Sequence, residues 1–564
     1  MFGLFKKKRF RKKLDLDASI AFLDSKNLPE FDSDKFEGVL EQPLSKKNFI
    51  GIFVVFLIIS FVFLIKTFNM QIINGEEYFK KAQGNFIKTA ILFSERGVVS
   101  DRNGKELIWN ERNINDRFAK RRYIEDVGFS HILGFLSYPQ KDKSNNFFEK
   151  EYKGKAGVEK YFNDKLNGVL GKRILETSAT GEVISENVIQ LSQAGENVAL
   201  SIDADIQKEM AELLNDFINE KNFDGASGVL MSVENGEIIS LVSLPEYDSN
   251  ILTDGRDKKK IKEYIFDEKK PFLNRVTLGE FAPGSVVKPF IALKALKEKI
   301  ISPYEKIYTN GKLILPNPYH PDKPSIFYDF RNNGIVDMKK AIAVSSNIYF
   351  YILGGGFENR KGLGINRLYE NFTDFGFGEQ TEVEYMIEKD GIVPSIEWKK
   401  RVFGTNWNIG NTYYASIGQF GFVATPLQIA VAVSAIANEG EVLRPKILKD
   451  SEKDVRRKLD FDKKDYEVVK QAMRETALSG TTMSLNLPFV KIASKSGTAE
   501  RGKNRSRVNS WVMGFFPYDK PKYAFVFLAE NGYAGENLNP VSLVSSAFFK
   551  KLEEKGLLER LLEH

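Results

Sequence analysis

Residues 225–243 read GASGVLMSVENGEIISLVS, and this stretch decides the fold of the larger part of the chain. Two apolar, β-branched runs flank Asn235-Gly236, which is the strongest short-range signal for a β-hairpin. Further strands are predicted at 490–493, 510–516 and 523–528, and helical patterns dominate between them, including 285–297 and 338–344. Strands at both ends with helices between predict an α+β domain whose sheet is closed by distant segments.

The composition excludes several classes of protein. The chain has 564 residues, 42% of them hydrophobic, so it has room for several domains and is not disordered as a whole. A net charge of +7 predicts no general affinity for nucleic acid. Without cysteine there is no disulfide, thiolate metal site or cysteine nucleophile, and three histidines leave little material for a zinc site. If the protein is an enzyme, its base is expected not to be imidazole.

An uncharged apolar run, FIGIFVVFLIISFVFLI, occupies 49–65 and is followed by Lys66. It reaches the length that crosses a hydrocarbon core about 30 Å thick, so 49–66 is predicted as a transmembrane helix. One alternative is a buried core helix, but a helix that is apolar all round has no side to show water; the other is a signal peptide, but this would need a shorter charged region and a small-residue cleavage site. The basic residues before it place the N-terminus in the cytoplasm and everything after about residue 67 outside: Lys6, Lys7, Lys8, Arg9, Arg11, Lys12, Lys13, Lys46 and Lys47.

The rest of the chain divides by composition. Short strands, short helices and turn pairs such as Asn103-Gly104 indicate a folded stalk before the hairpin. The end of the chain, KKLEEKGLLERLLEH at 550–564, favours an amphipathic helix. The predicted parts are a basic cytoplasmic segment, the transmembrane helix, the stalk, the sheet-containing domain and a C-terminal helix or tail: 1–48, 49–66, 67–224, 225–550 and 551–564.

The first candidate for chemistry is Ser285 with Lys288, at the start of a predicted helix. Positions i and i+3 share a helix face, so the hydroxyl and the amine can touch. A lysine whose pKa is lowered by burial and nearby cations can activate a serine as a nucleophile. Alone the pattern is weak, because a helix cap beside a solvated lysine has the same sequence.

Two later elements strengthen it. Ser345-Ser346-Asn347 follows a predicted helix, and Lys495-Ser496-Gly497-Thr498 follows an apolar run. Individually these are turn residues or a solvated strand end. Together, in this order and beyond the predicted span, the three elements resemble the pattern Ser-x-x-Lys, Ser-Asp-Asn and Lys-Thr-Gly of penicillin-binding proteins and serine β-lactamases, with Ser-Ser-Asn and Lys-Ser-Gly as the second and third. They predict an active site that contains Ser285, Lys288, Ser345, Asn347, Lys495, Ser496, Gly497 and Thr498.

The chain therefore resembles a class B penicillin-binding protein, a membrane-anchored D,D-transpeptidase of bacterial cell-wall synthesis, from the predicted span to about residue 550. The further matches lie in the stalk and before the nucleophile: Ser94-Glu95-Arg96-Gly97, Asp101-Arg102-Asn103-Gly104, His131-Ile132-Leu133-Gly134, Gly154-Lys155-Ala156-Gly157-Val158-Glu159, Ser243-Leu244-Pro245-Glu246-Tyr247-Asp248 and Asn274-Arg275. Three segments are similar to the elongation type, penicillin-binding protein 2: 407–412, 417–419 and 425–428. Phe420 and Glu500 depart from that type, which usually has Gly and Gln there.

The resemblance implies a fold and a mechanism. The fold is a single transmembrane helix, a mixed α/β pedestal of the dimerisation type and a transpeptidase domain with an antiparallel sheet flanked by helices. Ser285 would form an acyl-enzyme with a D-Ala-D-Ala stem peptide, Lys288 would take its proton, and Ser345 would protonate the leaving amine. Asn347 would bind the substrate and hold Lys288. Lys495, Ser496, Gly497 and Thr498 would bind the substrate, and the backbone N–H groups of Ser285 and Thr498 would form the oxyanion hole.

The resemblance also implies which cofactors, partners and cellular location to expect. No metal or organic cofactor is expected. The expected partners are peptidoglycan stem peptides, β-lactams, the lipid bilayer, a membrane-embedded SEDS-type glycosyltransferase and other membrane proteins of the elongation complex, and not nucleic acid. The protein is expected in the bacterial cytoplasmic membrane as a single-pass protein, with its catalytic domain in the periplasm or on the outer face.

The sequence is also compatible with four other roles. A division-type relative would act at the septum. A β-lactam receptor carries the same motifs but is usually linked to several membrane spans, and a β-lactamase would lack the long stalk. A scaffold that activates a glycan polymerase could use the stalk, and this role does not exclude catalysis.

Overall fold

The structure, a computed structural model, consists of two compact units. The first comprises Met1–Lys88 with Glu176–Ile184, and the second Thr89–Leu175 with Ser185–His564. The predicted basic segment 1–48 lies outside the described residues as far as position 44. The described residues are 45–112, 116, 118–143, 147–177, 183–317, 320–501, 506–534 and 541–563.

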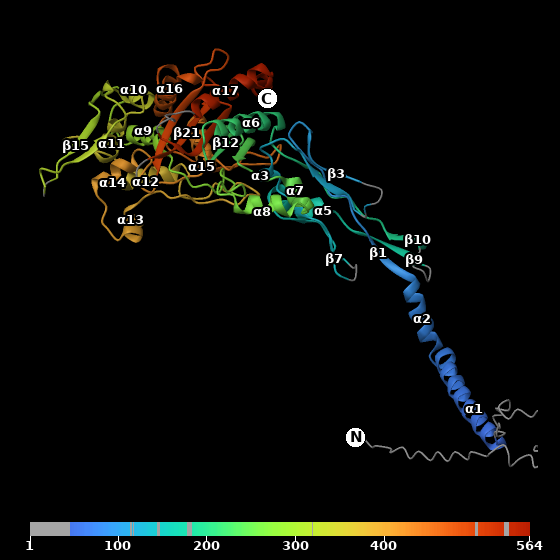
Figure 1. The fold of residues 1–564 in the computed structure, drawn as a ribbon. Coiled ribbons are helices and arrows are strands. Elements are labelled where there is room, and N and C mark those ends of the chain that lie inside the picture. Colours follow the sequence, from blue (N-terminus) through green and yellow to red (C-terminus); the bar gives the residue numbers. More distant parts are fainter. Residues whose placement is uncertain are drawn as a thin grey trace, which may run out of the picture. The chain divides into compact units, whose positions relative to one another are not determined.

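The first unit carries the helix expected to cross the membrane (Figure 1). α1 (Lys46–Phe68) continues into a π-helical turn, η4 (Asn69–Ile73), and α2 (Gly75–Phe86) follows. Within the described part of the chain, Lys46–Ile73 is the one helical stretch long and apolar enough to span a bilayer, and its apolar window is not buried inside the protein. The expected N-terminal apolar helix is therefore present, and its length and composition are those of a single membrane anchor.

The stalk in the second unit is built from short elements around a four-stranded sheet of order β11-β2-β3-β4. Val99, Leu107, Ile108 and Tyr123 from its strands are fully or almost fully buried. Between residues 87 and 199 the strands and helices are β1 (Ile87–Leu92), β2 (Val99–Ser100), β3 (Glu106–Glu111), β4 (Lys120–Tyr123), α3 (Ser130–Leu133), β5 (Leu136–Ser137), β6 (Gln140–Lys141), β7 (Phe147–Glu149), β8 (Lys153–Gly154), α4 (Gly157–Tyr161), α5 (Asn163–Asn167), β9 (Gly171–Thr177), β10 (Val183–Gln190) and β11 (Val198–Ala199).

A five-stranded antiparallel sheet, order β13-β12-β22-β21-β20, forms the centre of the second unit. The predicted hairpin is its first pair, β12 (Gly225–Ser232) with β13 (Ile238–Leu244). The other three strands come from the end of the chain, so the predicted closure by distant segments is confirmed. They are β20 (Ala493–Arg501), β21 (Arg507–Phe516) and β22 (Tyr523–Tyr533).

The strand predicted at 490–493 is misplaced, because β20 begins only at Ala493. Val490 and Ile492 are apolar because they are buried in a loop, not because they pair in the sheet. Lys495 and Thr498 instead pair with Met513 and Ser510 of β21. The third motif therefore lies within the edge strand of the sheet and does not follow it.

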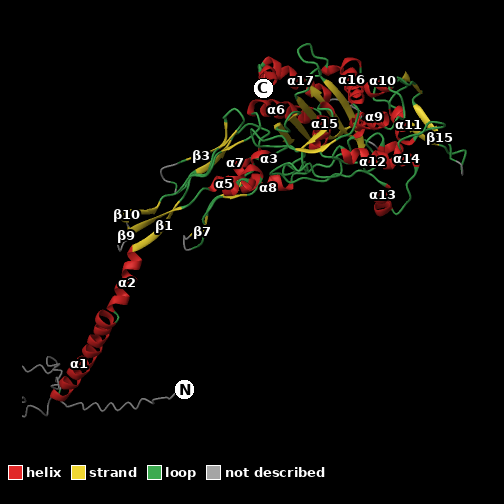
Figure 2. Ribbon diagram, turned by 180° about the vertical axis from the view of Figure 1, so that it is seen from behind, coloured by secondary structure: helices red, strands yellow, loops and turns green. Residues whose placement is uncertain are grey.

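Helices bury both faces of this sheet (Figure 2). Along β22, Phe525 and Phe527 belong to one core and Val526 and Leu528 to the other, which is the alternation of a strand. The first core also receives α6 (Ala204–Glu220), α17 (Val541–Glu554) and α18 (Leu557–Glu563). The second core receives α9 (Lys288–Lys297), α10 (Met338–Ala343), α15 (Pro426–Ala437) and α16 (Lys463–Ser479).

The remaining elements lie between these strands and helices in sequence. They are α7 (Ser249–Asp254), α8 (Lys258–Phe266), η5 (Gly284–Val287), β14 (Ile307–Thr309), β15 (Lys312–Leu315), β16 (Ser325–Tyr328), β17 (Gly334–Val336), α11 (Asn347–Gly355), α12 (Gly364–Asp374), α13 (Ile396–Phe403), α14 (Ile409–Ala415), β18 (Glu441–Leu443), β19 (Val455–Lys458) and η6 (Met483–Leu485).

One amphipathic helix is expected in the C-terminal segment, but the structure has two helices there. α17 ends at Glu554, and α18 begins at Leu557 after Gly556, whose φ is +67°. Glycine adopts this left-handed conformation at no steric cost and so ends a helix. The turn redirects α18, which buries Leu558 and Leu561 in the core that α6 shares.

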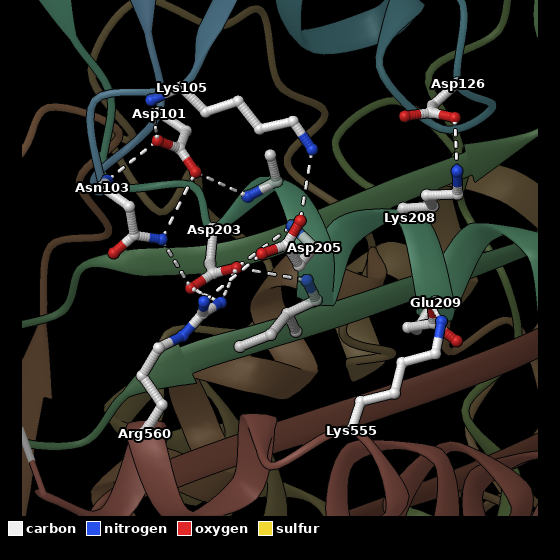
Figure 3. A network of polar contacts seen from close by, with 12 residues as sticks. Asp101, Asn103, Lys105, Asp126, Asp203, Asp205, Lys208, Glu209, Lys555 and Arg560 are labelled. Carbon is white, nitrogen blue, oxygen red and sulfur yellow. Dashed lines mark hydrogen bonds and ion pairs between the residues drawn. The ribbon is translucent and has the colours of Figure 1, made fainter.

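A polar network joins three segments that are far apart in the chain (Figure 3). Asp101, in the stalk, accepts a hydrogen bond from the backbone N–H of Ala204 at 3.1 Å, at the start of α6. Asp203 caps α6 and accepts from Asn103 Nδ2 at 3.0 Å. Arg560 of α18 donates from Nη2 to both carboxylate oxygens of Asp203, at 2.7 and 2.6 Å. The stalk motif, α6 and the C-terminal helix are therefore bound together through one carboxylate.

Candidate active site

Ser285 lies in a tight turn whose backbone is fixed from three sides. Gly284, with φ +59°, donates its N–H to the carbonyl of Gly418 at 3.0 Å. Trp511 of β21 donates from Nε1 to the carbonyl of Ala282 at 3.0 Å. A Cβ on Gly284 would lie 2.8 Å from the carbonyl oxygen of Thr498, so the turn lies directly against β20. The serine is thereby held beside the third motif.

The helix predicted at 285–297 has a 3₁₀ first turn. In η5 the N–H of Lys288 donates to the carbonyl of Ser285, and the α-helix begins only at Lys288. Pro289 has no N–H to donate to that carbonyl in an α-helical bond, which favours the tighter turn. Ser285 is 5% exposed and Lys288 is fully buried.

The Lys288 amine is surrounded by acceptors from the second motif. Its Nζ donates to the carbonyl of Ser345 at 2.7 Å, to Asn347 Oδ1 at 2.8 Å and to Ser345 Oγ at 3.3 Å. Nζ also lies 5.5 Å from the centre of the Phe350 ring. Among the described residues Ser285 Oγ forms no hydrogen bond with Lys288. A neutral Lys288 amine has two N–H donors and one lone pair. It could keep the hydrogen bonds to the Ser345 carbonyl and to Asn347 Oδ1, and present its lone pair in place of the longer bond to Ser345 Oγ.

Ser345 sits in the bend between α10 and α11, with φ +60°. A serine in the left-handed region is strained, so its neighbours must hold it there. The N–H of Ser345 donates to the carbonyl of Ile342 at 3.2 Å, and the N–H of Ser346 to that of Ala341 at 2.9 Å. The bend turns the Ser345 hydroxyl toward the two lysines of the site.

The third motif lies on β20, at the edge of the sheet. Lys495 is fully buried, and its Nζ donates to Ser345 Oγ at 2.9 Å and to the carbonyl of Ser496 at 2.7 Å. The Ser496 hydroxyl shares a 2.6 Å hydrogen bond with Thr481 Oγ1. A Cβ on Gly497 would lie 2.9 Å from the carbonyl oxygen of Pro283, so only glycine lets the nucleophile turn come this close.

Both amines of the site have lowered proton affinity. Burial lowers the pKa of Lys288 to about 7, and the carboxylate of Asp329 opposes that shift. Burial, and then the positive charge of Lys288, lower the pKa of Lys495 well below its usual value. Two buried amines that share one hydroxyl cannot both be charged at low cost, so the site favours a neutral amine near neutral pH.

The structure thus brings together residues that are predicted from three separate motifs. Ser285, Lys288, Ser345, Asn347 and Lys495 converge through the contacts described above, and Gly497 and Thr498 lie against the nucleophile turn. Ser496 points to Thr481 and not to another predicted site residue.

Sequence patterns did not predict four residues that build the site. Asp329 binds the start of α11, Thr481 binds the third motif, and Gly418 and Trp511 fix the nucleophile turn. Gly418 belongs to the segment 417–419 that pointed to the elongation type, and this was its only signal. The others have no regular spacing from the motifs.

Known protein families match both the stalk and the sheet-containing domain. Residues 226–552 match the penicillin binding protein transpeptidase domain, and residues 113–200 match the penicillin-binding protein dimerisation domain. The peptidoglycan D,D-transpeptidase MrdA of Haemophilus influenzae is 27% identical over 605 residues, which cover 88% of this chain and 90% of the relative. MrdA of Acinetobacter baumannii is 31% identical over 448 residues, covering 74% of this chain and 64% of the relative.

Solved structures are also similar. The complex between PBP2 and MreC from Helicobacter pylori matches with a TM-score of 0.69 and 25% identity, over 84% of this chain and 100% of the other. Pseudomonas aeruginosa PBP2 in complex with WCK 5153 matches with a TM-score of 0.67 and 26% identity, over 84% of this chain and 97% of the other. The transpeptidase match spans more than half of the chain, and the relatives are of the elongation type. The chain therefore belongs to the class B penicillin-binding proteins and, within them, to the elongation type, penicillin-binding protein 2.

Proposed function

We propose that this protein cross-links peptidoglycan stem peptides during cell elongation and shape maintenance, as a serine D,D-transpeptidase with Ser285 as nucleophile. One observation carries the proposal: two buried amines, Lys288 and Lys495, share the hydroxyl of Ser345 beside the turn that holds Ser285. Burial makes one of these amines a base near neutral pH, which is what activation of a serine hydroxyl requires.

The first half of the reaction forms an acyl-enzyme. Neutral Lys288 takes the proton of Ser285 while Oγ attacks the carbonyl between the two terminal D-alanines. The peptide C–N bond then breaks, and Ser345 passes a proton from the lysine to the leaving amine, which departs as D-alanine. Asn347 holds Lys288 through Oδ1 and binds the substrate amide.

The second half transfers the acyl group. An amine of a neighbouring stem peptide attacks the ester carbonyl, the ester C–O bond breaks, and the proton lost by the amine returns to Ser285. Splitting one acyl transfer into two steps replaces a difficult barrier with two smaller ones. A β-lactam presents its strained carbonyl to the same hydroxyl and stays bound as a covalent adduct.

The third motif binds the substrate in this proposal. Lys495 and Thr498 pair with the terminal carboxylate, Ser496 fixes the strand, and Gly497 lets the peptide approach the edge of β20. A bound carboxylate next to Lys495 would offset the cost of a charged amine there. The backbone N–H groups of Ser285 and Thr498 form the oxyanion hole, and one such donor is worth about 3 to 4 kcal/mol of barrier.

The same proposal covers the setting of the enzyme. The N-terminus lies in the cytoplasm and the catalytic domain outside the cytoplasmic membrane. The parts of the chain are those predicted from the sequence, 1–48, 49–66, 67–224, 225–550 and 551–564. The partners are a SEDS-type glycosyltransferase and other membrane proteins of the elongation complex; the Helicobacter pylori relative was solved with MreC, which supports the latter.

Mass spectrometry of the intact protein after penicillin treatment tests the proposal. One adduct per chain on the peptide that contains Ser285 is expected, and Ser285→Ala should remove it. An adduct of equal stoichiometry on Ser285→Ala would end the assignment. Slow loss of the adduct, over many minutes, separates a transpeptidase from a β-lactamase, which would hydrolyse it rapidly. Incorporation of a labelled amine into a stem peptide then separates a transpeptidase from a receptor.

A further inference from the structure

The loop after β16 contacts the start of α11, the helix that begins with Asn347. Asp329 Oδ1 accepts from the backbone N–H of Asn347 at 3.0 Å, and Oδ2 accepts from that of Ile348 at 3.3 Å. Oδ2 also accepts from the Ser346 hydroxyl at 2.6 Å. The first N–H groups of a helix have no partner within the helix, and a negative charge is favourable there. Asp329 therefore binds three consecutive residues at the start of α11, two of which belong to the second motif.

Tyr328, the residue before Asp329, fixes the orientation of the Asn347 side chain. Asn347 Nδ2 donates to the carbonyl of Tyr328 at 3.3 Å, while Asn347 Oδ1 accepts from Lys288 Nζ at 2.8 Å. With its NH₂ group directed to Tyr328, the amide can present only its oxygen to the lysine. The backbone and side chain of Asn347 are both held by residues 328–329.

The same contacts stabilise the bend at Ser345. A non-glycine residue in the left-handed region is strained, so its neighbours must hold it there. Asp329 binds Ser346, the next residue, and so holds the far side of the bend. If the bend relaxed, Ser345 Oγ would leave its positions near Lys288 and Lys495.

Asp329 also acts on Lys288 through its charge. The charged groups that face the lysine are Lys495 from β20 and Asp329 from the loop after β16. Burial lowers the pKa of Lys288, and the Asp329 carboxylate raises it. Asp329 is itself half-buried, so water screens this attraction less than at the surface.

We propose that Asp329 is a positioning residue for the acylation step: it holds Asn347 and Ser345 against Lys288 and places a negative charge near that lysine. This inference rests on the proposed function, because it needs Lys288 as the base that activates Ser285. It adds the loop after β16, which no motif contains, to the machinery of the site.

The test measures acylation of the full-length protein in detergent by a fluorescent penicillin, as a function of pH. Wild type and Ser285→Ala come first: failure of wild type to acylate would refute the proposed function and this inference with it, whereas a result confined to the Asp329 variants bears on the inference alone. Asp329→Asn keeps the shape and one acceptor oxygen but removes the charge. The matched control is Asp337→Asn, since Asp337 caps α10 by accepting from the N–H of Lys340 at 2.9 Å and has no bond to the second motif.

Asp329→Asn is expected to lower the plateau rate by about tenfold or more, because small displacements of catalytic groups are that costly. It should also move the acidic limb of the pH profile to lower pH, because removing the carboxylate lowers the pKa of Lys288 further. Asp337→Asn should change neither. The proposal would be overturned if the acidic limb of the Asp329→Asn profile had the wild-type midpoint. It would also be overturned if Asp329→Asn and Asp337→Asn had equal effects.

Asp329→Glu keeps the test decisive if Asp329→Asn does not fold. It retains the charge but changes the reach of the carboxylate, so the plateau should fall while the midpoint stays at the wild-type value. A midpoint displaced to lower pH in Asp329→Glu, despite the retained charge, would count against the electrostatic role and overturn the proposal. Thermal unfolding of each variant identifies those that have folded.

Discussion

Lys495 Nζ donates a hydrogen bond to Ser345 Oγ over 2.9 Å, although the two residues lie 150 positions apart in the chain. Lys288 Nζ lies 3.3 Å from the same oxygen. Because this oxygen accepts from both amines, the Ser345 proton is free to be donated elsewhere. One hydroxyl thus connects a helix, a bend and an edge strand, and in the proposed mechanism it carries a proton from the lysine to the leaving amine.

Ser345→Ala should remove this connection. The rate of Ser285 acylation by a fluorescent penicillin is expected to fall by about 10²- to 10⁴-fold, the usual contribution of a positioned proton-transfer group. Stopped-flow fluorescence measures it. Ser434→Ala is the control, since it removes a buried hydroxyl of α15 that has no hydrogen-bond partner among the described residues. A wild-type rate in Ser345→Ala would exclude the proton path.

Acylation should depend on pH through the base. The pKa of Lys288 is lowered from 10.5 to about 7, so the amine is neutral above that pH and protonated below it. A base acts only when it is unprotonated, so the rate should rise with pH to a plateau and should fall about tenfold per unit on the acidic side. The coupled lysines titrate as a pair, and the midpoint belongs to both. A flat profile between about pH 5 and pH 9 would contradict Lys288 as the base.

Lys495→Ala should distinguish a substrate-binding charge from a structural one. Acylation by a penicillin with a free carboxylate is expected to fall about 10- to 100-fold more than acylation by its methyl ester, given the energy of hydrogen bonds to charged groups. Lys491→Ala is the control, since Lys491 is 61% exposed and pairs with Asp519. Equal losses for both compounds would show that Lys495 serves the structure alone.

The sequence predicts elements that depend on local chemistry and fails where tertiary contacts decide. Asn235-Gly236 specifies its own turn, so the hairpin β12–β13 is predictable to within about one residue at each end. β20 is not, because its pairing residues, such as Lys495 and Ser496, are polar and serve the site. Gly556 is the opposite case, because this glycine is itself a local signal for the end of a helix. The strong helical pattern on both sides hides that signal.

The site is predictable to the same extent. Its three motifs can be read from the order of residue types, but their convergence requires the sheet. Asp329 has no fixed spacing from Ser345 and reaches Asn347 because it directly follows the hairpin β15–β16, which contacts α11. The stalk motifs at 94–97 and 154–159 can likewise be recognised in the sequence, but their structural role cannot. The structure supplies that role, because Arg96 and Glu159 form a buried ion pair.

Glu159→Gln should destabilise the stalk strongly. Glu159 accepts from Arg96 Nε and Arg121 Nε, both at 2.7 Å, and all three side chains are fully buried. Loss of the carboxylate leaves two guanidinium groups without a compensating charge, which costs about 3 to 5 kcal/mol in such sites.

Thermal unfolding and amide hydrogen exchange in β3 and β4 would measure the loss. Glu186→Gln is the control, since its pair with Arg173 is partly exposed and is worth about 1 kcal/mol or less. Exchange in β3 and β4 that is unchanged by Glu159→Gln would show that the buried pair does not hold the stalk together.

Arg560→Ala should release the C-terminal helix. Arg560 binds both oxygens of Asp203, whose side chain is 4% exposed, and this carboxylate would keep only its bonds to Asn103 and to the N-terminal N–H groups of α6. The loss of a hydrogen-bonded charge pair is expected to cost about 2 kcal/mol. That is enough to raise amide exchange in α18 by roughly thirtyfold, since 1.4 kcal/mol is a factor of ten.

Lys551→Ala is the matched control, because its pair with Glu554 is exposed on both sides and such pairs contribute little. Exchange in α18 that matches wild type in Arg560→Ala would mean that the buried leucines of α18 dock the helix without help from the ion pair.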